Sequence, residues 1–314
     1  MKTCIAVLGS LNMDFVVSVE HLPASGETVL GRNFQMIPGG KGANQACAAG
    51  KLAGPGLQVR MAGRVGYDIF ADHLKASLSA AGVDVSYVHA ARAEPTGVAL
   101  IWVDRNGQNS IVVASGANHA LPVSDVEALR PVFRGARLAL FQLETPLDTV
   151  AAALRIAREE GAATVLDPAP AQPLSPELLG GADILTPNES EACLLLGRAA
   201  ARLTLQDAPA VALALRALGP RAVILKLGEQ GCYYSDAAQS LSIPAFPVTA
   251  RDTTAAGDTF NGALAVALAE NQSVEDALRF ASAAAALSVT RRGAQASIPA
   301  RAETDALCRP APVR

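Results

Sequence analysis

The sequence predicts an α/β fold, with a mainly parallel central sheet covered by helices on both faces and a second, small antiparallel sheet. Short apolar strands alternate with Ala- and Leu-rich helices along most of the chain. Two segments, at about residues 12–40 and 95–114, instead show the pattern of hairpins with one solvated face. With 314 residues, 50% of them hydrophobic, the chain is long enough to bury a sizeable core.

The alternating units begin with a continuous apolar strand that ends at Gly9-Ser10. Most later units are closed by a glycine, a proline or a polar turn. The predicted strands are residues 4–8, 59–62, 138–141, 164–166, 183–185 and 222–225, and the predicted helices are residues 69–81, 147–160, 189–196, 211–218, 257–269 and 274–289. In such a sheet, ligands bind at the carboxyl ends of the strands.

The hairpin segments are recognised by strand-like runs that turn residues interrupt. Residues 15–19 and 27–35 are separated by Pro23 and Gly26, and residues 98–103 and 110–113 are joined through Asn106-Gly107, a strong hairpin turn signal. We expect both segments to belong to one small sheet.

Composition and charge exclude several classes of function. The net charge of -3 gives no electrostatic attraction to nucleic acid or to an acidic membrane surface. The five cysteines form no C-x-x-C pair, so we expect no disulfide framework, no zinc site and a reducing, cytoplasmic location. The first apolar run is too short for a signal peptide, and we expect no membrane span. A small-molecule partner is favoured.

A loop that leads into a helix, residues 252–260, carries the most informative chemistry. The sequence Asp-Thr-Thr-Ala-Ala-Gly-Asp-Thr-Phe places small residues where free N–H groups of a helix start can hold an anion such as phosphate. Asp258 follows directly and could act as a base beside that anion. This suggests phosphoryl transfer to a hydroxyl. An ordinary capped surface helix explains the local pattern equally well.

A glycine-rich loop, Gly-Gly-Lys-Gly-Ala-Asn-Gln at residues 39–45, is the second informative stretch. Its glycines allow close backbone approach, and Lys41 and Asn44 supply a charge and an amide. It does not match the Walker A loop, and no G-x-G-x-x-G follows the first strand, so a dinucleotide-binding unit is unsupported. A glycine-rich surface turn is the alternative interpretation.

Taken in order, these two stretches resemble the signatures of the ribokinase-type (PfkB) sugar kinases. The resemblance extends over nearly the whole chain, through Gly-Ser-Leu-Asn-Met-Asp at 9–14, Ser-Gly-Ala-Asn at 115–118, Asp-Pro-Ala-Pro at 167–170 and Thr-Pro-Asn-Glu at 186–189. It implies a three-layer α/β/α fold with a small β-sheet lid over the sugar. It also implies one kinase domain over residues 1–314, with the lid formed by about residues 12–40 and 95–114.

The resemblance implies roles for individual residues. Asp258 matches the catalytic base, and the backbone N–H groups of Ala255, Ala256 and Gly257 match the site that stabilises developing negative charge. The implied sugar site consists of Asn12, Asp14, Gly40, Lys41, Asn44, Glu144 and Asp258. On the local pattern alone, a turn and the start of a hairpin are the commoner explanation of Asn12 and Asp14.

The resemblance further implies a nucleotide site and two metal sites. The nucleotide positions are Asn188, Lys226, Gly228, Gly231, Gly257 and Ser282. Asn188 and Glu191 resemble an N-x-x-E element associated with Mg²⁺ and phosphate, although a helix cap is the alternative. The positions that match a monovalent cation site, for K⁺, are Asp252, Thr254, Ser288, Arg291, Gly293 and Ser297, most through backbone carbonyls.

The implied reaction is transfer of the γ-phosphate of ATP to the 5-hydroxyl of D-ribose, in a homodimer that pairs through the lid. The alternative is a related kinase for another small sugar, such as deoxyribose, or for a nucleoside. A non-catalytic sugar-binding relative is a further alternative, which retention of Asp258 disfavours.

Overall fold

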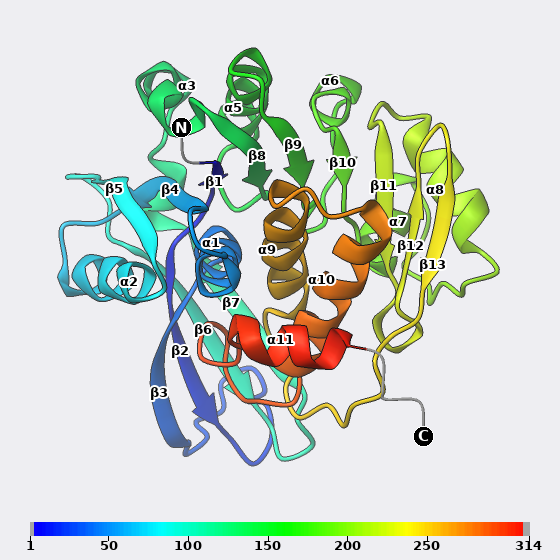
Figure 1. Cartoon of the computed structure of the whole chain (residues 1–314). Coiled ribbons are helices and arrows are strands. Elements are labelled where there is room, and N and C mark those ends of the chain that lie inside the picture. The colour runs from blue at the N-terminus through cyan, green and yellow to red at the C-terminus, as the bar shows by residue number, and fades with distance from the viewer. Residues whose placement is uncertain (1–2, 310–314) are drawn as a thin grey trace.

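The computed structural model describes residues 3–309 and contains two β-sheets (Figure 1). The larger sheet has nine strands in the order β13-β12-β11-β10-β9-β8-β1-β4-β5. These strands are β1 Cys4–Leu8, β4 Gln58–Val65, β5 Val83–Ala90, β8 Ala136–Phe141, β9 Ala163–Leu166, β10 Ile184–Leu185, β11 Ala222–Lys226, β12 Cys232–Ser235 and β13 Ser240–Ile243. Every pairing from β5 to β11 is parallel, whereas β12 and β13 are added antiparallel. The predicted α/β class is confirmed.

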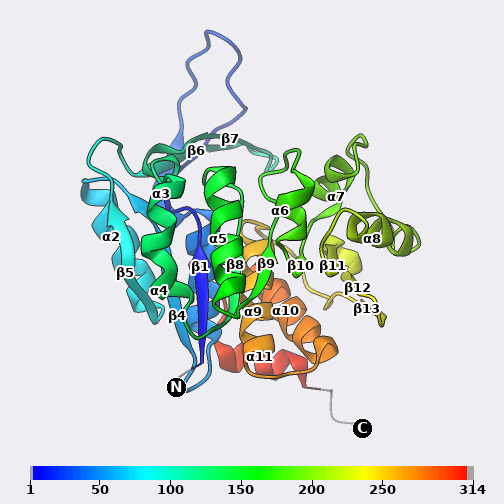
Figure 2. The same cartoon turned by 90° about the horizontal axis from the view of Figure 1, so that it is seen from above.

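Helices cover both faces of this sheet, as Figure 2 shows from above. Side chains alternate along β1, so that Ile5 and Val7 enter one hydrophobic core while Ala6 and Leu8 enter the other. The first core is covered by α1 Lys41–Leu52, α2 Ile69–Ala80, α9 Ala256–Ala269 and α10 Val274–Ser288, with α11 Arg301–Cys308 against α10. The second is covered by α3 Val123–Val126, α4 Arg130–Phe133, α5 Leu147–Glu159, α6 Pro176–Gly180, α7 Glu189–Leu195 and α8 Ala208–Arg216. Within residues 3–309, no helix combines the length and apolar character that crossing a membrane requires.

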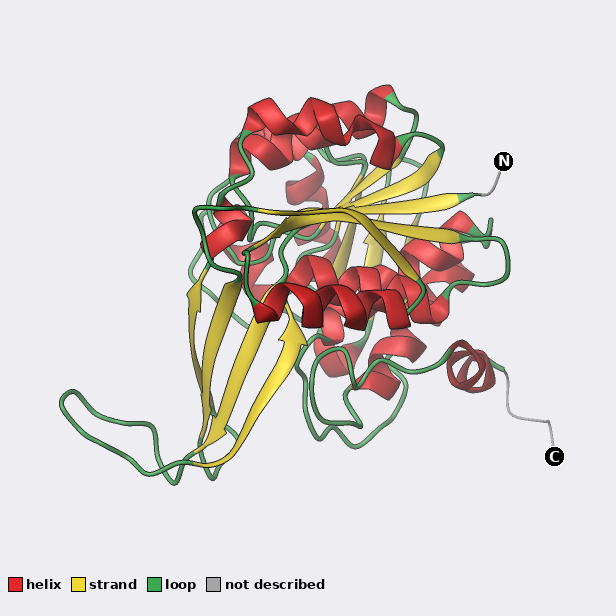
Figure 3. Ribbon diagram, turned by 90° about the vertical axis from the view of Figure 1, so that its left-hand side faces the viewer, coloured by secondary structure: helices red, strands yellow, loops and turns green. Residues whose placement is uncertain are grey.

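The small sheet projects from this body, as Figure 3 shows. It contains β3 Arg32–Gly39, β2 Asn12–Ser18, β6 Gly97–Val103 and β7 Asn109–Ala114, in that order. Each hairpin is antiparallel within itself, and the two are joined by a parallel pairing of β2 with β6. Asn12 and Asp14 therefore lie in β2, at the start of the first hairpin of this sheet.

Some elements were not predicted from the sequence. They include the two edge strands of the large sheet, β5 and β13, the strand β12 next to β13, and the short helices α6 and α11. Edge strands carry polar residues on their exposed positions, so β5 lacks the continuous apolar run of a central strand. The predicted strand over residues 27–35 is shifted, because β3 begins at Arg32 and continues to Gly39.

Close packing of α9 against α1 sets the position of the first turn of α9. A Cβ atom on Gly262 would lie 2.6 Å from the Ala48 Cβ and 2.6 Å from the carbonyl oxygen of Gln45. No side chain fits at this crossing, so the two helix backbones approach unusually closely. This approach brings the amino-terminal end of α9 beside the glycine-rich loop.

We predict that Gly262→Ala lowers the free energy of unfolding by about 1–3 kcal/mol, because its methyl group forces α1 and α9 apart. Chemical denaturation measures the change. Gly180→Ala is the matched control, since a Cβ there meets no atom within 4 Å. Equal effects of the two substitutions would contradict the assigned role of the helix crossing.

Candidate active site

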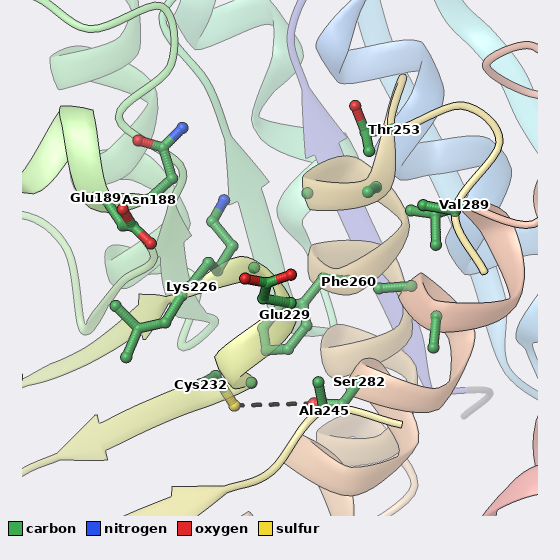
Figure 4. Close-up of a pocket in the computed structure, with 18 of the residues that line it drawn as sticks. Asn188, Glu189, Lys226, Glu229, Cys232, Ala245, Thr253, Phe260, Ser282 and Val289 are labelled. Carbon is green, nitrogen blue, oxygen red and sulfur yellow. Dashed lines mark hydrogen bonds between the residues drawn. The ribbon is translucent and has the colours of Figure 1, made fainter. Parts of the chain in front are cut away.

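A cleft of about 960 Å³ lies at the carboxyl ends of the central strands, beside α9 and α10 (Figure 4). Asn188 and Lys226 lie on the opposite side of the cleft from Val289, which follows α10. The cleft has room for a nucleotide. Residues proposed from the sequence that line it are Lys41, Asn188, Glu191, Lys226, Gly228, Gly231, Ala255, Ala256, Gly257, Asp258 and Ser282.

The start of α9, where the sequence predicts an anion site, lines the cleft. Ala255 adopts a left-handed conformation, with φ of 57°, which turns the chain sharply into the helix. Gly257 leaves the surface open, because a Cβ there would approach only the Lys226 Nζ, at 3.3 Å. The N–H of Ala256 already donates to the carbonyl of Thr253 at 3.2 Å, so the three predicted donors are not equivalent in this conformation.

Asp258 is buried in the first turn of α9, with both carboxylate oxygens hydrogen-bonded. Asn44 Nδ2 donates to its Oδ2 at 3.0 Å, and Gln45 Nε2 donates to its Oδ1 at 3.1 Å. Burial raises the pKa of Asp258 to about 6, against the lowering effect of Lys41 and these two amides, while Asp167 raises it further. Such a carboxyl group can exchange a proton near neutral pH.

Two groups that the sequence did not identify as functional extend this network. Asp167, directly after β9, accepts a hydrogen bond from Lys226 Nζ at 2.9 Å and one from Gln45 Nε2 at 3.0 Å. The sequence carried a signal for both. Asp167 stands at the carboxyl end of a predicted strand, and Gln45 follows Asn44 in the glycine-rich loop motif.

The predicted sugar residues gather on the other side of Asp258, at the base of the small sheet. Gly40 has φ of 90°, and a Cβ there would lie 2.7 Å from the backbone nitrogen of Asn12. Glu144 accepts hydrogen bonds from the Lys41 N–H at 3.0 Å and from Ser10 Oγ at 2.5 Å. The glycine-rich loop, β2 and Glu144 are thus brought together.

Asn118 orients Asn12, although no functional role was predicted for it from the sequence. Its Nδ2 donates to Asn12 Oδ1 at 2.7 Å and to the carbonyl of Leu11 at 3.1 Å, while its Oδ1 accepts from the Leu11 N–H at 2.9 Å. With its oxygen engaged, the Asn12 amide has its NH₂ group left to donate. The signal was present in the Ser-Gly-Ala-Asn motif that ends at Asn118.

Buried charge dominates the electrostatics of the site. Burial, with the neighbouring Glu144 and Asp258 carboxylates, raises the pKa of Asp14 to about 7. Burial alone would lower the pKa of Lys41, but the carboxylates of Asp258, Asp167, Glu144 and Glu191 outweigh it and raise that pKa above its ordinary value. Lys41 is therefore held in its charged form.

Asn188 and Glu191 form a helix cap as well as lining the cleft. Asn188 Oδ1 accepts from the Glu191 N–H at 2.9 Å, and the Glu191 carboxylate accepts from the Asn188 N–H at 2.7 Å. Burial raises the pKa of Glu191, with Lys226 opposing. Over residues 3–309 no group of three or more His, Cys, Asp or Glu side chains could hold a metal ion by themselves.

The six positions matched to a monovalent cation lie on the loop before α9, at the last residue of α10 and on the loop that follows α10. The Asp252 carboxylate accepts from the N–H groups of Thr254 at 2.9 Å and Gly293 at 2.8 Å, which joins the two loops. The Arg291 guanidinium is paired with Glu303, so only its backbone can face an ion. The hydroxyls of Ser288 and Ser297 each donate to a backbone carbonyl of their own turn.

The other wall of the cleft was not identified from the sequence. It includes apolar residues that follow β13, from Ala245 to Val248, together with Ala285, Ala286 and Val289. An apolar wall opposite glycines and charged groups suits a ligand with an aromatic part and a charged part.

The comparisons with known proteins agree with this geometry. The model of the pfkB family carbohydrate kinases matches residues 2–301. The ribokinase of Haemophilus influenzae is 44% identical over 304 residues, 97% of this chain and 98% of that protein. The deoxyribokinase of Salmonella typhi is 36% identical over 296 residues, 94% of this chain and 95% of that protein. The structure of Arabidopsis thaliana ribokinase complexed with ribose and ATP has a TM-score of 0.90 and 34% identity, and the match covers 99% of this chain and 100% of that chain. The chain belongs to the pfkB family of carbohydrate kinases.

Proposed function

We propose that the protein transfers the γ-phosphate of ATP to the 5-hydroxyl of D-ribose. The observation that carries the proposal is the position of Asp258, a buried carboxylate between the cleft and the polar residues of the small sheet. Ribose is favoured over deoxyribose because the ribokinase of Haemophilus influenzae is 44% identical, compared with 36% for the deoxyribokinase of Salmonella typhi.

In the proposed mechanism, Asp258 accepts the proton of the sugar hydroxyl as that oxygen attacks phosphorus. General base catalysis of this kind contributes roughly 10²–10⁴-fold in rate. The N–H groups at 255–257 and Lys41 stabilise the negative charge that develops on the transferred phosphoryl group. Because the Ala256 N–H is engaged with Thr253, we infer that this turn opens when the phosphate binds.

The sugar is proposed to lie between Asp258 and the small sheet. Asp14, Glu144 and the amides of Asn12 and Asn44 there can accept from and donate to vicinal hydroxyls. We propose that residues 1–314 form one kinase domain in which the small sheet, from about residues 12–40 and 95–114, closes over the sugar as a lid. Addition of ribose should then protect β2 and β6 amides from hydrogen exchange; unchanged exchange would argue against closure.

We propose that ATP binds in the cleft through Asn188, Lys226, Gly228, Gly231, Gly257 and Ser282. Mg²⁺ would supply charge neutralisation of the phosphates, and Asn188 and Glu191, which carry side-chain oxygens and line the cleft, would hold it, because Mg²⁺ uses few protein oxygens. K⁺ fits the joined loops of Asp252 and Gly293 and would order the turn before α9. Turnover that is unaffected by removal of Mg²⁺ or K⁺ would contradict the respective assignment.

The small sheet also supports a homodimer. By the strand register, Ile111 and Val113 lie on the same face as Asp14, and both side chains are exposed. A second copy of this sheet would cover that apolar face. A single-chain mass in light scattering would contradict the dimer.

We also propose a cytoplasmic location, which the free cysteines support because a reducing compartment keeps thiols unpaired. Cell fractionation can test this location.

We predict that Asp258→Asn lowers kcat about 10²–10⁴-fold, because the amide cannot accept the hydroxyl proton. The wild-type rate should rise as the pH passes through about 6, the pKa of Asp258, because the carboxylate is the active form. A coupled assay of ADP release measures both. A variant with the wild-type rate would remove Asp258 from this role.

The same assay with a panel of sugars tests the substrate. D-Ribose should give the highest kcat/KM, above deoxyribose and nucleosides. Turnover of another sugar but not of ribose would show that the substrate assignment is wrong.

We predict that the melting temperature of Asp14→Asn, measured relative to that of wild type, increases as the pH rises from about 5 to about 8. The pKa of Asp14 is raised to about 7 in the folded chain, so the stability that its protonated form contributes is full below about pH 4 and lost as the pH rises through 7. Thermal unfolding at both pH values measures the difference.

Asp104→Asn is the control of opposite sign. Asp104 lies in the turn between β6 and β7. Burial raises its pKa, but hydrogen bonds from the N–H groups of Gln108 and Asn106 outweigh burial and lower that pKa below its ordinary value. That variant should lose stability relative to wild type above about pH 4. A pH-independent effect of Asp14→Asn would contradict the raised pKa.

A further inference from the structure

The side chain of Gln45 bridges two carboxylates from distant parts of the chain. Its Nε2 donates to Asp258 Oδ1 at 3.1 Å and to Asp167 Oδ2 at 3.0 Å. Gln45 is only 1% exposed, so water does not compete for these contacts. Asp167 in turn accepts from Lys226 Nζ, which lines the cleft. One amide thus links the base to the lysine in the nucleotide cleft.

The orientation of the Gln45 amide follows from the hydrogen-bonding capacity of its two carboxylate partners. Ionised carboxylates only accept hydrogen bonds, so the end of Gln45 between them must be its NH₂ group. Its Oε1 accepts from Gln142 Nε2 at 2.7 Å. Gln142 in turn depends on Gly9, because a Cβ there would lie 2.0 Å from Gln142 Oε1. Gln142, which follows β8, and Gly9, which follows β1, therefore hold the Gln45 amide in place.

We propose that Gln45 is a positioning residue for phosphoryl transfer, which holds the Asp258 carboxylate at a fixed distance from the Asp167–Lys226 pair. Gln142 acts through Gln45 by fixing its amide. The proposal rests on the proposed function, in which Asp258 accepts the hydroxyl proton. Gln45 acts on the reaction through its hydrogen bond to Asp258, and Gln142 acts one step further away, through Gln45.

The surrounding charges explain why such a bridge matters. Asp258 faces Lys41 from α1, Asp14 from β2 and Asp167 from the end of β9. Without the Gln45 NH₂ group, two buried carboxylates would face each other with one donor fewer for each. Repulsion would then turn Asp258 away from its position and favour its protonated form.

Replacement of Gln45 by leucine tests the proposal, because the side chain keeps its bulk but loses both hydrogen bonds. We expect kcat for ribose phosphorylation to fall about 10-fold or more, as expected for lost hydrogen bonds to a charged group. The acid limb of the pH–rate profile should move up by about half a unit or more. The KM for ATP should stay within about twofold.

Gln142→Leu is the second variant and is expected to shift kcat and the acid limb in the same direction by smaller amounts. Thr164→Val is the matched control. Thr164 is fully buried on β9, and its hydroxyl bonds to Gly181 and Asp183, outside the site. The control should lose melting temperature without a change in the pH profile.

The variant Asp258→Asn distinguishes a failure of the proposed function from a failure of the positioning role of Gln45. If that variant keeps the wild-type rate, the proposed role of Asp258 fails, and the role of Gln45 fails with it. If it is inactive while folded Gln45→Leu has the wild-type kcat and acid limb, only the positioning role is overturned. Should Gln45→Leu fail to fold, an unchanged profile of Gln142→Leu overturns the proposal in its place.

Discussion

The close crossing of α1 and α9 is the constraint on which the site depends. Gly262 lets the two helices meet backbone to backbone, and this places the first turns of both helices side by side. Asn44 and Gln45 of α1 then donate to both oxygens of Asp258 on α9. A wider crossing would leave a buried carboxylate without donors, which is energetically costly. The crossing of α1 and α9 therefore determines both the packing of the two helices and the hydrogen bonding of Asp258.

This arrangement buries negative charge, which destabilises the folded state. Asp14, Asp167, Glu144 and Asp258 are clustered, with Lys41 and Lys226 between them, and the pKa values of Asp14 and Asp258 are raised to about 7 and about 6. Clusters of this kind destabilise a fold and are typical of functional sites. The cluster is also placed to respond to bound phosphates, since anions would compete with the carboxylates for the two lysines.

The family and the fold class could be predicted from the sequence because both depend on local patterns and on motif order. The strand ends, the glycine-rich loop and the loop before α9 each have a local signal, and all the predicted nucleotide residues line one cleft. Edge strands such as β5 were missed because their polar residues obscure the apolar pattern. Asn12 and Asp14 were assigned to the sugar site only through the motif resemblance, since their local pattern is also that of a turn and the start of a hairpin, and they lie in β2.

The sequence by itself determined the order of strands and helices, the helix start that precedes Asp258, and the residue types available for catalysis. Only the tertiary structure decided which of these residues meet. Gln45 contacts Asp167, 122 residues away, and Asp258, 213 residues away, and no local pattern encodes contacts at such separations. The raised pKa values likewise arise from burial and from neighbours in space, which exist only once the helices have packed against the sheet.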